Sequence, residues 1–289
     1  MLTSLVLAAS AAIISPSASA TTPSTVPVAA AVDASSAVSF KTKDKLILKG
    51  SYFAPKKSKS KSKAAPAALL IHDAGSDRSE LESVAGYLQK RGFAVLVVDL
   101  RGHGESAEED GTFEKASEED QETMWSLSSR DINAAAEFLV DQEGVHSTNL
   151  SLVGFGAGAS LAVRRAANDD NVRALVLVNP TRENFGYNLV NGVSELGGLP
   201  TLLMAPKDRR DDARRLQTAA HEENEGLEYV EISNLKSEAA EVLADKRLNA
   251  SLGKWLRGAL NFSSGCDVSL DIHEHLDHVQ RWHVHVATC

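Results

Sequence analysis

The sequence is poor in cysteine, in basic charge and in long apolar runs. Its two cysteines, Cys266 and Cys289, both lie near the C-terminal end. A disulfide between them, which an oxidising compartment would permit, would close that segment on itself and would not cross-link the core. The formal net charge is −9, which argues against a nucleic-acid partner, because such a protein needs a basic patch or stripe. After residue 20, no stretch is long and apolar enough to cross a membrane.

The one apolar run outside the core pattern lies at the N-terminus and resembles a targeting segment. Leu5–Ala9 and Ile13–Ile14 are apolar, and Ala18-Ser19-Ala20 has the small-x-small pattern of a signal-peptide cleavage site. We therefore predict a signal peptide over residues 1–20 and a secreted or periplasmic protein with no membrane attachment after cleavage. An uncleaved anchor is the alternative, although the run is short for a span that needs about 20 residues.

The rest of the chain has the pattern of a single α/β domain. Residues 21–37 are rich in Ala, Ser, Thr, Pro and Val and predict a flexible linker. A half-buried hairpin follows over Val38–Phe53, where apolar and polar residues alternate. From Ala67 onward, continuous apolar strands alternate with amphipathic helices, which indicates a parallel sheet covered on both faces. The acidic segment Glu105–Glu122 is interpreted as a solvated loop. The predicted domain spans residues 38–260, and residues 261–289 form a C-terminal extension.

One stretch in this domain has the layout of a catalytic turn. Asn149–Val163 combines a short apolar strand, a glycine-rich turn and the start of a helix. That is the arrangement of a nucleophile elbow, Gly-x-Ser-x-Gly, which presents a serine at the top of a sheet. Here the central residue is Gly156. Glycine has no side chain, so it cannot form an acyl-enzyme.

Two further motifs make the chain resemble the α/β-hydrolase superfamily. These are His72-Asp73-Ala74-Gly75 after an apolar strand, and Asp99-Leu100-Arg101-Gly102-His103-Gly104-Glu105-Ser106 after the next one. The resemblance covers Val38 to Leu260. It implies the α/β-hydrolase fold, with a mostly parallel central sheet of about eight strands and helices on both faces. The segment between Pro180 and Pro200 is short, as in capless exported carboxylesterases and dienelactone-hydrolase-like proteins.

The resemblance also assigns catalytic positions, and here the triad is degenerate. The nucleophile position is Gly156, and the acid position falls at Asp208. The base should lie in the loop Ser233–Glu238, which contains no histidine, and Ser237 stands at the expected place. His72 and His103 are interpreted as structural residues that anchor loops, and Ser160 as a small packing residue one turn into the helix.

The oxyanion donors implied by the resemblance are the backbone N–H groups of Ala74 and Ala157. Such donors survive changes of side chain. However, Asp73 stands where the family usually has glycine. A carboxylate beside an oxyanion pocket opposes developing negative charge, unless the side chain points away.

The C-terminal extension is rich in histidine. His273 with His275, and His283 with His285, are i, i+2 pairs that would share one face of a strand. Imidazole suits zinc, copper or nickel, so a metal site is one interpretation. The other, which we favour, is a solvent-exposed tail or hairpin. We predict no cofactor.

Three functions are consistent with this sequence. The first is an inactive pseudohydrolase that serves as a binding or scaffolding module, with a small-molecule ligand in the vestigial pocket. The second is an active serine hydrolase acting on small esters with relocated catalytic groups. The third is a metal-binding accessory protein that uses the C-terminal histidines.

Overall fold

The computed structural model describes residues 35–55, 64–107, 111–221, 227–232 and 246–262. The predicted signal peptide, Ser237, both cysteines and the histidine-rich extension lie outside these residues. In the described ranges, none of the helices has the length and apolar character needed to span a membrane.

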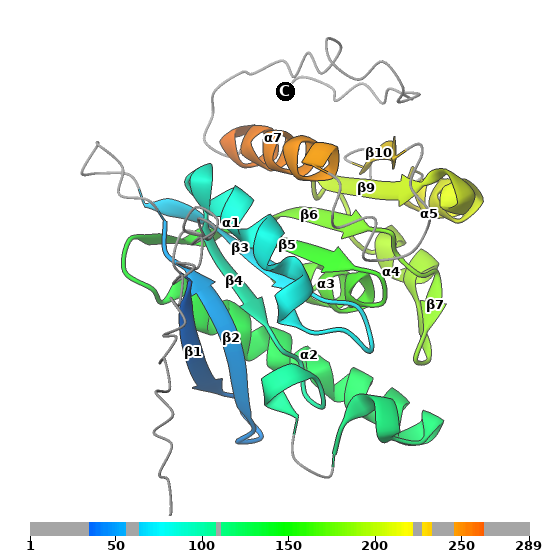
Figure 1. The fold of residues 1–289 in the computed structure, drawn as a ribbon. Coiled ribbons are helices and arrows are strands. Elements are labelled where there is room, and N and C mark those ends of the chain that lie inside the picture. Colours follow the sequence, from blue (N-terminus) through cyan, green and yellow to red (C-terminus); the bar gives the residue numbers. More distant parts are fainter. Residues whose placement is uncertain (1–34, 56–63, 108–110, 222–226, 233–245, 263–289) are drawn as a thin grey trace, which may run out of the picture. The chain divides into compact units, whose positions relative to one another are not determined.

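An eight-stranded sheet forms the centre of the domain (Figure 1), in the order β1-β2-β4-β3-β5-β6-β9-β10. Strand β2 is antiparallel to both of its neighbours, and all pairs from β4 to β10 are parallel. This confirms the predicted α/β-hydrolase fold with its mostly parallel sheet. The strands are β1 (Ser36–Lys41), β2 (Ile47–Phe53), β3 (Ala65–Ile71), β4 (Ala94–Val98), β5 (Val145–Phe155), β6 (Val172–Val178), β9 (Thr201–Pro206) and β10 (Leu227–Ile232).

Helices cover both faces of the sheet because each central strand buries side chains on both sides. In β3, Leu69 and Ile71 belong to one apolar cluster, and Ala68 and Leu70 belong to the other. The first cluster includes residues of α2, α3, α4 and α5, and the second includes residues of α1 and α7. The helices are α1 (Glu82–Lys90), α2 (Glu118–Val140), α3 (Gly158–Ala166), α4 (Leu189–Ser194), α5 (Arg210–His221) and α7 (Lys246–Phe262).

Helix α2 begins earlier than the sequence pattern suggested. The interpretation of Glu105–Glu122 as a solvated loop is wrong for its last residues, since α2 starts at Glu118. Ser117 caps the helix, and its hydroxyl accepts a hydrogen bond of 3.2 Å from the Asp120 N–H. Acidic residues in the first turn also interact favourably with the helix dipole. The capping serine followed by acidic residues was therefore a helix-start signal.

The parallel strands place the motif residues at one edge of the sheet. His72 and Asp73 follow β3, Asp99 follows β4, Gly156 follows β5, and Asp208 follows β9. In parallel α/β sheets, ligands bind beyond the carboxyl ends of the strands. A short hairpin, β7 (Glu183–Asn184) with β8 (Tyr187–Asn188), and α4 occupy the segment after β6.

Candidate functional site

The strand–turn–helix elbow is formed by β5, Gly156 and α3. Gly156 has φ = +53°, a left-handed conformation that favours glycine, and its N–H donates a hydrogen bond of 3.0 Å to the Val178 carbonyl of β6. Gly158 lies against the loop after β3, because a Cβ at this position would collide with the His72 carbonyl oxygen. The sharp turn of a nucleophile elbow is thus present without a nucleophile.

The Asp73 carboxylate occupies the space above Gly156. A Cβ on Gly156 would lie closer than 3.0 Å to Cγ and to both carboxylate oxygens of Asp73, a separation that real Cβ atoms do not show. A serine at residue 156 and the observed Asp73 rotamer therefore exclude each other. The absence of a side chain at Gly156 is thus matched by the presence of the Asp73 side chain in the same space.

The two backbone amides expected to bind an oxyanion both bind Asp73. The Ala157 N–H donates to Oδ1 of Asp73 at 2.7 Å, and the Ala74 N–H donates to the same atom at 2.8 Å. Burial raises the pKa of the Asp73 carboxyl, and these two hydrogen bonds oppose that shift. The sequence left the direction of this side chain open, and in the structure it points into the site.

His72 and His103 support the loop that carries Asp73. The Leu100 N–H donates to Nε2 of His72 at 3.1 Å, and Nδ1 of His72 lies 2.7 Å from the Asp73 carbonyl oxygen. In His103, Nε2 accepts from the Gly75 N–H at 3.3 Å, and Nδ1 lies 2.8 Å from the Arg101 carbonyl oxygen. The proton of each ring is therefore assigned to Nδ1.

These contacts keep both imidazoles neutral and structural. Burial lowers the pKa of His72 to about 4 and also lowers the pKa of His103. Each ring uses both nitrogens for backbone groups, so neither has a nitrogen left to accept a proton from a nucleophile. Their interpretation as loop anchors agrees with this geometry.

Asp99 fixes the neighbouring loop in the same way. Its carboxylate accepts hydrogen bonds from the Arg78 N–H at 2.8 Å and the Glu105 N–H at 3.0 Å, and it pairs with the Arg78 guanidinium. That guanidinium also pairs with Glu105 at 2.8 Å. The Asp-x-Arg-Gly-His-Gly-x-Ser motif thus holds loops together, with Arg101 bound to the buried Asp131 at 2.6 Å.

Ser160 is buried in the first turn of α3 and is fully occupied by hydrogen bonds. Its hydroxyl lies 2.8 Å from the Ala157 carbonyl oxygen and 3.2 Å from Oδ1 of Asn184, and it accepts a hydrogen bond of 3.1 Å from the Trp125 indole N–H. Trp125 contacts Phe185, at the tip of the β7–β8 hairpin, with ring centroids 5.0 Å apart. Ser160 thus links α2, the elbow and the hairpin, in keeping with a packing residue.

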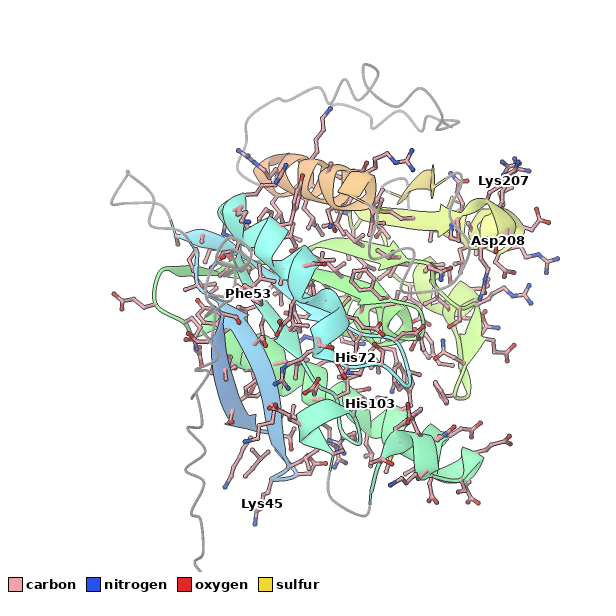
Figure 2. All side chains as sticks on the ribbon, in the orientation of Figure 1. Lys45, Phe53, His72, His103, Lys207 and Asp208 are labelled. Carbon is pink, nitrogen blue, oxygen red and sulfur yellow. The ribbon has the colours of Figure 1, made fainter. Side chains whose placement is uncertain are left out.

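Of the remaining predicted positions, the structure describes only Asp208. Asp208 lies in η4 (Lys207–Arg209) after β9 and is exposed. Figure 2 shows it well away from the neighbouring pair His72 and His103, whose rings are 4.9 Å apart. Ser237 and the histidines 273, 275, 283 and 285 lie outside the described residues, and within those residues no cluster of three metal-ligating side chains occurs.

Sequence reasoning missed the role of Asp73 because it treated two substitutions separately. One signal was available: compared with the family pattern, residue 156 is smaller than usual and residue 73 is larger than usual, since they are glycine and aspartate here. Only the fold brings these two positions into contact, since 156 − 73 = 83 residues separate them in the sequence.

Comparisons with known proteins agree with this fold. Over 132 residues the chain is 31% identical to a multifunctional-autoprocessing repeats-in-toxin of Vibrio cholerae, covering 44% of this chain and 3% of the toxin. The corresponding toxin of Vibrio vulnificus is 30% identical over 140 residues, covering 45% of the chain and 2% of the toxin. The chain thus spans only a small part of these relatives.

Solved structures with a similar fold include several hydrolases. An esterase of Pyrococcus furiosus superposes with a TM-score of 0.62 at 16% identity, covering 78% of this chain and 92% of the esterase. A dienelactone hydrolase of Anabaena variabilis has a TM-score of 0.57 at 18% identity, covering 79% and 97%. A sequence model of the alpha/beta hydrolase family matches residues 68–286. The chain belongs to the alpha/beta hydrolase family.

Proposed function

We propose that this protein is a non-catalytic member of its family, which keeps the hydrolase pocket as a binding or scaffolding module. The observation that carries the proposal is the Asp73 carboxylate. It fills the volume of the missing nucleophile and takes up both amides that would stabilise a tetrahedral intermediate. Acyl transfer through a serine needs the nucleophile, the base and the oxyanion donors together.

The histidines in the described part of the chain support the same conclusion. A general base must reach the proton that it removes, about 2.6–3.2 Å between heavy atoms. Both ring nitrogens of His72 and of His103 contact backbone groups, and burial lowers the pKa of both rings. At residue 237, where the resemblance places the base, the sequence has serine.

An esterase with relocated groups is the competing function. It requires a serine hydroxyl bonded to a histidine near Ala157. Ser160 does not meet this requirement, because its contacts are the Ala157 carbonyl, Asn184 and Trp125. Ser76 points its hydroxyl toward the Asp77 carbonyl oxygen at 3.4 Å. These bonds favour the non-catalytic role.

The deciding experiment measures hydrolysis of short-chain p-nitrophenyl esters by the full chain. We expect no turnover above that of heat-denatured protein, and no labelling by a serine-directed fluorophosphonate. Gly156→Ser should also stay inactive, because it has no base. Turnover that the phosphonate abolishes would overturn the proposal in favour of the relocated esterase. Turnover that a chelator abolishes would point instead to the C-terminal histidines.

Export and the disulfide are further proposals. If residues 1–20 are a signal peptide, the mature protein recovered from the host's extracytoplasmic fraction begins at Thr21. Its mass before and after reduction and alkylation then shows whether Cys266 and Cys289 are paired. Recovery of the intact N-terminus from the cytoplasm would contradict export.

A further inference from the structure

The two oxyanion amides already hold a carboxylate in this structure. Ala74 and Ala157 donate to one oxygen, Oδ1 of Asp73, at 2.8 and 2.7 Å. Such lengths are typical of hydrogen bonds with an ionised acceptor. Ala157 is also the N-cap residue of α3, and a helix N-terminus favours negative charge. The site is thus suited to bind a carboxylate, and its present occupant comes from the chain itself.

The amides are held in place without the Asp73 side chain. The loop after β3 is fixed by the His72 and His103 rings, which bond to backbone groups of Asp73 and Gly75. The elbow is fixed by the Gly156 N–H on the Val178 carbonyl and by the close packing of Gly158 on His72. Removing the Asp73 carboxylate would therefore leave two aligned donors, a preorganised site rather than a collapsed one.

Contacts of its carboxylate alone hold the Asp73 side chain in the site. The side chain is mostly, but not fully, buried. Oδ1 takes both amide bonds, and Oδ2 has no hydrogen-bond partner among the described residues. Gly156 contributes no side chain that would hinder rotation of the carboxylate. A side-chain rotation toward solvent breaks these two hydrogen bonds and weakens the attraction between the carboxylate and the Arg209 cation.

We infer that the Ala74–Ala157 amide pair is a binding site for the carboxylate group of a small acid, and that the Asp73 side chain is an internal ligand that such an acid can displace. This inference rests on the proposed binding role and names the ligand class of the vestigial pocket. The same two donors that would stabilise an oxyanion in an active hydrolase bind a carboxylate oxygen here. Asp73 competes with the ligand. The apparent association constant of the wild type is therefore the intrinsic constant multiplied by the fraction of molecules in which Asp73 has left the amides.

The test is an NMR titration with sodium butyrate at constant ionic strength. We expect Asp73→Ala to show saturable shifts of the Ala74 and Ala157 amide signals. The wild type should need at least about tenfold more butyrate. Asp73→Asn is the matched control, because its amide oxygen still accepts both hydrogen bonds and keeps the site closed. Glu80→Gln removes a carboxylate whose field reaches Asp73 without opening the site, and should behave like the wild type.

The outcomes separate this inference from the proposed function. If Asp73→Ala showed no specific shift, or if Asp73→Ala and Asp73→Asn showed equal shifts, the role of Asp73 as a displaceable internal ligand would be overturned. If Asp73→Ala does not fold, Asp73→Gly, which carries the residue usual in the family, provides the same test. Ester turnover by Asp73→Ala or Asp73→Gly would overturn the non-catalytic role. Specific butyrate binding by the same variants would still support the carboxylate site at the amide pair.

Discussion

Restoring the missing serine alone should destabilise this protein. In Gly156→Ser, the new Cβ would overlap the Asp73 carboxylate, so Asp73 must leave the two amides that it binds. The new residue must also adopt the left-handed φ of +53°. The prediction is therefore that the cost of the substitution depends on Asp73, and that replacing Asp73 by glycine removes most of it.

The size of the effect follows from these two contributions. A left-handed φ costs a residue other than glycine about 1 kcal/mol. Loss of two hydrogen bonds to a charged group costs roughly 1.5–3 kcal/mol each when nothing replaces them. Asp73 is mostly but not fully buried, so water compensates for part of this loss and the lower end applies. We expect Gly156→Ser to lower the unfolding free energy by about 4 kcal/mol with Asp73 present and by about 1 kcal/mol with Asp73→Gly.

Urea denaturation followed by circular dichroism measures all four members of this double-mutant cycle. Gly197→Ser is a matched control, because Gly197 has φ = +57° and a Cβ there would meet nothing within 4 Å. It should cost about 1 kcal/mol in both backgrounds. A clash between residue 156 and Asp73 would be refuted if Gly156→Ser cost no more than Gly197→Ser, or if its cost were unchanged by Asp73→Gly.

Three other predictions concern the frame around the site. Burial lowers the pKa of His72 to about 4. Between pH 6.5 and pH 4 the unfolded chain therefore binds a proton at His72 that the folded chain does not bind. As the pH falls through this range, the His72 contribution to the unfolding free energy should decrease by about 1.4 kcal/mol per pH unit. Imidazole ¹⁵N signals should show this ring neutral at pH 5, and titration near pH 6.5 would contradict the assignment. Asp131→Ala leaves the buried side of the Arg101 guanidinium without its partner and should lower the unfolding free energy by about 3 kcal/mol in urea, whereas Asp131→Asn should cost less; equal costs would contradict the ion pair's role. Trp125→Phe removes the hydrogen bond from the indole N–H to the Ser160 hydroxyl. It should lower the unfolding free energy by about 1 kcal/mol in the same assay. An equal decrease in a Ser160→Ala background would show that this hydrogen bond contributes nothing.

Most of the fold could be predicted from local patterns. Continuous apolar strands such as Ala94–Val98 are buried on both faces of a parallel sheet. Because that burial requires an unbroken run of apolar residues, the sequence predicts these strands directly. The start of α2 was misplaced because charged residues were taken as evidence for a loop, although acidic residues after a capping serine favour a helix start. Apolar periodicity is weak in the first turns of such a helix, so its boundary depends on the cap.

The sequence by itself determined that serine is absent at residue 156 and histidine is absent from residues 233–238, because both facts concern side-chain chemistry at positions that motifs locate. It also suggested that Ala74 and Ala157 face a common site. Only the tertiary structure decided where Asp73 points. That direction depends on the loop after β3 meeting the elbow after β5, where glycine leaves space and two amides lack another acceptor. A carboxylate that would oppose catalysis in an open pocket is stabilised here by the donors that catalysis would use.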